Sequence, residues 1–276
     1  MIENRSFIVE KIADLPFYTE GPVTDKIGNI FCTTLSGGTI LKINSRNEIS
    51  EWAKSACPNG QIILPGGDHL ICDSMLASVR RFSSKGEFLK NEIEKYCADF
   101  RVYSPNDLIA DKSGNLYFTD SVRDKGKVFF LGINGDQKIV ATGIDYPNGL
   151  VLSAAGDSLY VAESYKNRIL KIKLKAPGSA DGTADVLVNL PINPLGTETG
   201  NLPDGLAMHN NGELFVAHYG MQAVQVISNT GKLIQSIDTN MPLTSNLCFL
   251  DDHTILVTGG LGEPGPGALY KISFKL

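Results

Sequence analysis

Six residues that carry a carboxylate or amide oxygen stand at the head of six similar segments of this 276-residue chain. They are Glu20, Asn59, Asn106, Asn148, Asp204 and Asn246. None of them is His or Cys, and oxygen ligands of this kind favour a hard cation such as Ca²⁺, Mg²⁺ or Mn²⁺ over a soft metal. Two of the six, Glu20 and Asp204, are carboxylates, which would balance one divalent ion. The sequence therefore predicts a cation site, provided that the fold brings these side chains together.

The same residue types also form turns, and this leaves a second interpretation open. Asn or Asp followed by Gly is a common turn former, so six similar segments could simply need six similar turns. Glu20 argues against turns as the whole reason, because Glu is a poor turn residue. Gly21 and Pro22, which follow it, would already be sufficient for a turn.

The elements that must position these residues repeat along the chain. Each head residue is followed by an apolar run, a turn rich in Gly or Asp, and a second apolar run, as in NDLIADKSGNLYFTDS from Asn106. A third run and a more polar fourth run follow in most repeats, and their alternation has the period of half-buried strands. Repeats of about 40 to 55 residues built of short strands are typical of propeller blades.

We therefore expect an all-β fold, a six-bladed β-propeller with four strands per blade and a single domain over residues 1–276. The sixth repeat ends at Leu276 without a fourth strand, and residues 6–12 (SFIVEKI) are expected to supply it. The N-terminal strand would then join the last blade and close the ring, which leaves no open sheet edge. In such a ring the six head residues face one central channel, with Glu20 and Asp204 on opposite sides.

Composition and charge exclude several kinds of partner. The net charge is −5 without a basic cluster, which argues against nucleic acid. No apolar run could cross a bilayer and no secretory signal starts the chain, so we expect no membrane partner and a cytoplasmic location. The five cysteines form no Cys-x-x-Cys pair, which favours reduced thiols. We expect a monomer or a small homo-oligomer.

The four histidines do not suggest a familiar catalytic centre. His69, His209 and His253 precede second strands, at the end of the blade far from the head residues, and are expected to be exposed. His218 ends the second strand of its repeat and could contact a substrate or shuttle a proton. The equivalent residues of other repeats are expected to hydrogen-bond turn amides; they are Asp73, Asp120 and Glu163. No Gly-x-Ser-x-Gly motif supports a serine hydrolase.

Five segments together resemble one known family. They are EGPVTD, RVYSPNDLIADKSGNLYFTDS, YPNGLVLS, LPDGLAM and TSNLCFL, and the set is similar to the senescence-marker-protein/gluconolactonase family, which includes regucalcin and bacterial sugar lactonases. The resemblance covers essentially the whole chain. It implies a six-bladed propeller that binds one divalent cation in its channel and hydrolyses a sugar lactone, of the aldonolactone or gluconolactone type, in carbohydrate metabolism. Calcium is the favoured cation, with magnesium, manganese and zinc as alternatives.

The resemblance also implies roles for individual residues. The metal ligands fall on Glu20, Asn148 and Asp204, and Asp204 is also the proposed base. Asn106 of the Ser-Pro-Asn-Asp motif and the upstream Arg101 are expected to bind the substrate. Tyr103 stands where many members have Asn and is expected, like His218, to contact the substrate.

Two other functions remain open at this point. The chain could hydrolyse another lactone or an ester on the same scaffold, or it could be a calcium-binding propeller without catalysis. The Gly-rich segment 259–267 is expected to form a mobile loop over the channel, not a phosphate-binding loop.

Overall fold

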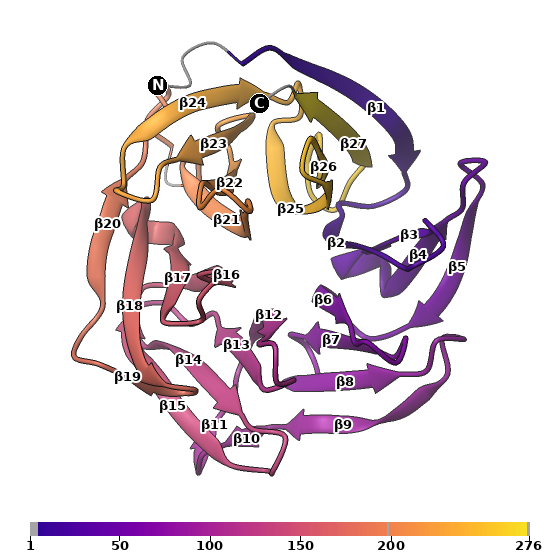
Figure 1. The fold of residues 1–276 in the computed structure, drawn as a ribbon. Helices are drawn as coiled ribbons and strands as arrows, with labels where there is room; N and C mark the ends of the chain where they lie inside the picture. The colour runs from indigo at the N-terminus through magenta and orange to yellow at the C-terminus, as the bar shows by residue number, and fades with distance from the viewer. Residues whose placement is uncertain (1–4, 198, 275–276) are drawn as a thin grey trace.

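The computed structural model of the chain describes residues 5–197 and 199–274, and these form a six-bladed β-propeller. Six antiparallel sheets are arranged around one axis, and each sheet runs outward from a short inner strand (Figure 1). The fold class predicted from the repeats is thereby confirmed. Within the described residues no helix is long and apolar enough to span a membrane.

Each blade takes one inner, one second and one third strand from consecutive segments. The inner strands are β2 (Glu20–Thr24), β6 (Pro58–Ile63), β12 (Pro105–Ala110), β16 (Pro147–Leu152), β21 (Leu202–Met208) and β25 (Leu243–Asp251). The second strands are β3 (Ile30–Thr33), β7 (His69–Asp73), β13 (Leu116–Asp120), β17 (Ser158–Glu163), β22 (Leu214–Tyr219) and β26 (Thr254–Gly260). The third strands are β4 (Thr39–Ile43), β8 (Ser78–Phe82), β14 (Gly126–Leu131), β18 (Arg168–Ala176), β23 (Ala223–Ile227) and β27 (Gly267–Phe274).

The fourth strands differ most from the expected plan. They are β5 (Ile49–Lys54), β9 (Phe88–Glu94), β15 (Gln137–Ile144), β20 (Asp185–Asn189), β24 (Leu233–Asp238) and, in the last blade, β1 (Phe7–Leu15). The second blade carries two further short strands outside β9, namely β10 (Tyr96–Cys97) and β11 (Phe100–Arg101). In the fourth blade β18 is long enough to pair with both β20 and a short β19 (Ser179–Ala180). Two short 3-10 helices, η1 (Leu35–Gly37) and η2 (Ser164–Lys166), follow β3 and β17.

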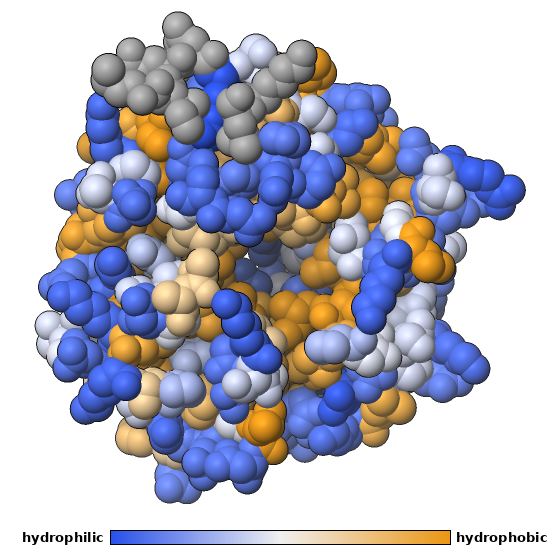
Figure 2. All heavy atoms as spheres, viewed as in Figure 1, coloured by the Kyte–Doolittle hydropathy of each residue, from blue (hydrophilic) through white to orange (hydrophobic). Residues whose placement is uncertain are grey.

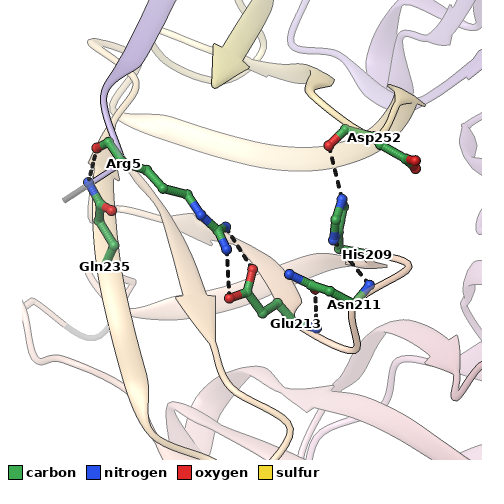
Figure 3. A network of polar contacts seen from close by, with 6 residues as sticks. All are labelled: Arg5, His209, Asn211, Glu213, Gln235 and Asp252. Atoms are coloured by element: carbon green, nitrogen blue, oxygen red, sulfur yellow. Dashed lines mark hydrogen bonds and ion pairs between the residues drawn. The ribbon is translucent and has the colours of Figure 1, made fainter. Parts of the chain in front are cut away.

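The first and last strands of the chain pair in the last blade, as predicted. The N-terminal strand β1 pairs with β27 from Phe7↔Phe274 to Leu15↔Gly267, so it is the outer strand of that sheet (Figure 1). Just before β1, the guanidinium of Arg5 forms two hydrogen bonds of 2.7 and 2.9 Å with the carboxylate of Glu213 in the fifth blade (Figure 3). The side chains of this ion pair are only 3% and 10% exposed. It therefore attaches the N-terminal segment to the neighbouring blade.

The hydrophobic core lies between neighbouring sheets. Between the second and third blades, for example, Phe118 and Phe129 stack with their ring centroids 5.1 Å apart, and Leu70 packs against the same cluster. Equivalent apolar clusters join the other neighbouring blades, because alternate residues of the second and third strands point to either side. This packing fixes the inner strands around the axis.

Two histidine predictions were wrong. His69 is 2% exposed because its ring packs against Trp52, with 4.2 Å between centroids, and its Nδ1 lies 3.2 Å from Gln61 Oε1. His209 is 3% exposed because it packs beside Phe249, and its Nε2 lies 2.9 Å from the Asp252 carbonyl oxygen (Figure 3). His253 is exposed, as expected.

Candidate metal and substrate site

An irregularity of strand pairing recurs in every blade, at the head residue or, for Glu20, directly after it. Near its start, the pairing of each inner strand with the second strand shifts register. The shift spans two residues in five blades, as between Pro203 and Leu206, and one residue, Ser245, in the sixth. Such a bulge leaves the intervening residue unpaired and re-aims its side chain. In the fifth blade that residue is Asp204, and Asn59, Asn106 and Asn148 occupy the same place in their blades.

The glycines that follow the head residues form a second, narrower level of the channel. A Cβ added to Gly149 would lie 2.7 Å from the Cα of Gly205, so these backbones approach too closely for a side chain. A Cβ on Gly60 would overlap the Asp107 carboxylate, and one on Gly205 would overlap Asn246. Asp107 and Asn246 therefore stand at the level of the glycines and fill the space that the glycines leave.

This geometry corrects the position assigned to Asn246. The residue that corresponds to the other head residues in the sixth blade is Ser245, and Asn246 lies one level deeper. Ser245 donates a 2.6 Å hydrogen bond to the carbonyl oxygen of Thr19. The error arose because the sixth segment has Ser-Asn where the others have an acidic or amide residue followed by Gly or Asp.

Glu20, Asn148 and Asp204 come together at the head-residue level. They are only 4%, 7% and 6% exposed, although they come from the first, fourth and fifth blades. The prediction that Glu20 and Asp204 lie on opposite sides of the channel was wrong, because only the sixth blade separates theirs. Burial raises the pKa of Glu20 to about 8, with a further contribution from the charge of Asp107. Burial also raises the pKa of Asp204 well above its usual range, as do the charges of Glu20 and Asp107, while a hydrogen bond with Asn148 acts in the opposite direction. Two carboxylates in one buried site are costly unless a proton or a cation compensates them.

These residues fit a divalent cation. One oxygen of Glu20 accepts a 3.1 Å hydrogen bond from the Tyr18 hydroxyl, but the other, Oε2, is buried and has no hydrogen-bond partner among the described residues. The Oδ1 of Asn59 is likewise buried and has no hydrogen-bond partner among the described residues. Such oxygens, with two carboxylates nearby, are the donor set that hard cations prefer. The described residues contain no group of three or more His, Cys, Asp or Glu side chains arranged for a metal; the set here includes an amide.

The axis continues as an apolar cavity on the other side of the glycine level. It has a volume of about 220 Å³ and is lined by residues such as Leu108, Leu150 and Leu206, with Asp107 and Asn246 at its inner end. Figure 2 shows the hollow at the centre of the ring with hydrophobic residues beside it. Apart from Gln61, Asp107 and Asn246, the residues that line this cavity are apolar or Gly.

The other residues predicted to bind substrate are distributed differently. Asn106 is 7% exposed and stands at the head-residue level. Tyr103 is 55% exposed and its ring lies 5.2 Å from the guanidinium of Arg101. Arg101 itself is exposed on β11, the outermost strand of its sheet (Figure 1). No interaction in the described structure joins Arg101 to Glu20 or Asp204, and its role remains a prediction.

His218 is fully buried, and both of its ring nitrogens have neighbours. Nε2 lies 3.0 Å from Asn167 Oδ1 and Nδ1 lies 3.3 Å from Gln225 Nε2. Burial lowers its pKa to about 4, so the ring is neutral near pH 7. Contact with a substrate would require these neighbours to move, and the substrate-binding role of His218 remains a prediction.

The acidic residues that end the second strands accept hydrogen bonds from backbone amides, which is the structural role expected for them. Asp120 accepts hydrogen bonds of 2.9 and 2.6 Å from the amides of Tyr103 and Ser104. Asp73 and Glu163 accept hydrogen bonds from backbone amides in the same way. These amides belong mainly to the loops that lead into the inner strands, so the carboxylates position the head residues.

Sequence reasoning missed Asp107, although a signal was present. Three of the segments read Asn-Gly or Asp-Gly at this point, whereas the third reads Asn106-Asp107. A side chain at a position that is otherwise glycine points into the space that the glycines leave open. Burial raises the pKa of Asp107 to about 7.

Comparison with known proteins gives consistent matches. Residues 18–260 match the model of the SMP-30/Gluconolactonase/LRE-like region. The lactonase drp35 of Staphylococcus haemolyticus is 28% identical over 240 residues, which cover 82% of this chain and 71% of that protein. Among solved structures, XC5397 of Xanthomonas campestris, described as a gluconolactonase, superposes with a TM-score of 0.83 at 21% identity over 97% of this chain and 89% of its own. A calcium-binding regucalcin of Agrobacterium tumefaciens superposes with a TM-score of 0.77 at 18% identity over 98% and 95%.

Proposed function

The chain belongs to the SMP-30/gluconolactonase/LRE-like family, and from that premise we propose that it hydrolyses a sugar lactone of the aldonolactone type to the aldonic acid with the aid of one divalent cation. The observation that carries this proposal is the buried cluster of Glu20, Asn148 and Asp204, in which Glu20 Oε2 lacks a hydrogen bond from the described residues. The relatives named lactonase and gluconolactonase support the reaction. The relative named as a calcium-binding protein supports calcium.

Each residue of the cluster has a defined task in this reaction. Glu20, Asn148 and Asp204 would hold the cation, which when bound supplies Lewis-acid stabilisation of the negative charge that develops on the lactone carbonyl oxygen. Asp204 accepts the proton of the attacking water as general base. Without a cation, burial and the neighbouring carboxylates favour the protonated form of Asp204; a bound cation would favour the ionised carboxylate, which is the form that can act as a base. Asn106, at the same level of the channel, orients the substrate or the water.

Hydrolysis of a panel of aldonolactones, followed with a pH indicator, tests the proposal. The protein is first treated with a chelator and then given Ca²⁺, Mg²⁺, Mn²⁺ or Zn²⁺ separately. We expect little activity without a cation and restored activity on part of the panel with Ca²⁺. Tight cation binding without hydrolysis of any lactone would contradict the enzymatic proposal and favour a cation-binding propeller.

A further inference from the structure

The loop between β26 and β27, residues 261–266, lies at the same end of the propeller as the candidate site. It is closed by a 3.0 Å hydrogen bond from the Leu261 amide to the Pro266 carbonyl oxygen. The amide of Tyr18 donates a 2.9 Å hydrogen bond to the Pro264 carbonyl oxygen, and a Cβ added to Gly265 would lie 2.9 Å from the Cα of Phe17. The loop is therefore attached to the segment that leads directly into Glu20, instead of extending freely from the blade.

This loop holds the carboxylate of Glu263 in a defined place. Oε1 of Glu263 accepts a 2.9 Å hydrogen bond from the hydroxyl of Tyr219. The ring of Tyr219 packs edge-on against that of Tyr18, with 6.1 Å between centroids, and Tyr18 is bonded to Glu20. Two tyrosines thus connect Glu263 to the candidate metal ligand. Glu263 is nevertheless exposed, so its second oxygen can meet a molecule that enters the channel.

The charge of Glu263 acts on groups from several blades around the channel mouth. It contributes to the raised pKa of Asp204 and of Tyr219 in the fifth blade. It also contributes to the raised pKa of Tyr146, about 12, in the segment that enters the fourth blade. The Tyr219 ring that holds Glu263 also packs against Tyr18, which is bonded to Glu20, so the carboxylate of Glu263 lies at the Glu20 end of the channel.

No basic side chain neutralises Glu263 in the part of the chain that the structure describes. Its side chain accepts a hydrogen bond from the neutral hydroxyl of Tyr219 and takes part in no ion pair among the described residues. A divalent cation would offset the charges of Glu20 and Asp204 below it. The carboxylate of Glu263 would then remain as a negative charge beside the path of the substrate.

We propose that Glu263, held by Tyr219, determines specificity at this site: it selects neutral lactones that bear hydroxyl groups and rejects lactones that carry a carboxylate or a phosphate. This inference rests on the proposed lactonase function. The exposed oxygen of Glu263 accepts a hydrogen bond from a hydroxyl group of the substrate, whereas a second negative charge at this place is repelled.

A matched pair of substrates tests the inference. A neutral aldonolactone is compared with an aldarolactone of the same ring size, which differs by a free carboxylate. Glu263→Gln keeps a hydrogen-bond acceptor but removes the charge, so kcat/KM for the anionic lactone should rise about tenfold at low salt, while that for the neutral lactone should fall about two- to threefold because a charge-assisted hydrogen bond becomes a neutral one. Because Glu263 is exposed, salt should screen its charge, and the increase in kcat/KM for the anionic lactone should nearly disappear at about 0.5 M salt. Glu87→Gln, in an exposed turn at the opposite end of the blades, removes the same charge and should change neither value.

The outcomes separate this inference from the proposed function. If the wild-type protein hydrolyses both lactones equally well at low salt, or if Glu263→Gln changes both by the same factor, the assignment of Glu263 is overturned while lactonase activity stands. If the wild-type protein hydrolyses neither lactone with any cation, the proposed function is overturned, and the specificity role falls with it. Tyr219→Phe, which releases Glu263, should give a smaller and likewise salt-dependent gain for the anionic lactone.

Discussion

Tyr18 and Glu20 are joined by a 3.1 Å hydrogen bond that occupies one carboxylate oxygen and leaves the other without a partner among the described residues. The bond fixes the orientation of a candidate metal ligand, and such supporting contacts typically contribute 10- to 100-fold to metal affinity. Tyr18→Phe should therefore weaken Ca²⁺ binding about tenfold, measured by calorimetric titration. Tyr96→Phe, at an exposed position on β10, is the control. Unchanged affinity in Tyr18→Phe would show that this bond does not support the site.

Cation binding should depend on pH because protons compete for the same carboxylates. Since the pKa of Glu20 is raised to about 8 and that of Asp204 is also raised, both hold protons near neutral pH when no cation is present. Ca²⁺ affinity should fall as the pH is lowered from about 8 to 6, and binding should release protons. Calorimetry in two buffers of different ionisation enthalpy measures that release. Binding that is independent of pH and releases no protons would contradict this account.

The same shift predicts how the stability of the cation-free protein changes with pH. A carboxyl group whose folded pKa is raised keeps its proton where the unfolded chain has lost it. Through Glu20, the free energy of unfolding should therefore decrease as the pH rises from about 4.5 to about 8. Added Ca²⁺ should stabilise the protein more at pH 8 than at pH 6, which thermal unfolding at the two pH values measures.

His218 should make the protein sensitive to acid. Its pKa is lowered from 6.5 to about 4 by burial, so the unfolded chain binds a proton in this window and the folded protein does not. The stability that His218 contributes is complete above pH 6.5 and is lost as the pH falls toward 4, by on the order of 3 kcal/mol. In urea unfolding between pH 4 and 7, His218→Gln should reduce this slope and His253→Gln, at an exposed position, should not. Equal slopes in both variants would argue against a buried neutral His218.

The ion pair of Arg5 and Glu213 should be important for stability because it is buried. Removing one partner leaves the other charge buried and unpaired, which costs about 3–5 kcal/mol. We expect Arg5→Met to lower the free energy of unfolding by that amount and the double variant Arg5→Met/Glu213→Leu to recover most of it. Exposed Lys11→Met, which breaks the surface pair with Asp14, should cost less than about 1 kcal/mol. A small effect of Arg5→Met would mean that the N-terminal segment contributes little to holding the ring.

The repeat pattern predicted the fold well because strand periodicity and turn residues are local properties. It placed the inner strands, the six blades and the pairing of the N-terminal strand with the last blade. It also placed Glu20, Asn148 and Asp204 at one level of the channel. It could not distinguish Ser245 from Asn246, because a bulge of one residue decides which side chain reaches that level and the sequence does not show where pairing resumes.

The rest of the site depends on contacts between distant segments. Glu263 is linked to Glu20 through Tyr219 and Tyr18. Because this link joins segments far apart in the sequence, it forms only after the first and last blades have come together. The burial of His69 and His209 likewise depends on aromatic neighbours from other strands, such as Trp52 and Phe249. Periodicity shows that a residue is near a turn but not whether another side chain covers it.

Asp204 is the residue on which the proposed function depends most, because it would hold the divalent cation with Glu20 and Asn148 and would also serve as the base in lactone hydrolysis. The most direct measurement is kcat for one aldonolactone as Ca²⁺ is titrated into chelator-treated protein, with Asp204→Asn beside the wild type and Asp181→Asn as an exposed control. The account predicts saturable activation of the wild type and of the control, and a kcat lowered about 10²- to 10⁴-fold in Asp204→Asn. Hydrolysis that needs no cation, or near wild-type turnover by Asp204→Asn, would contradict it.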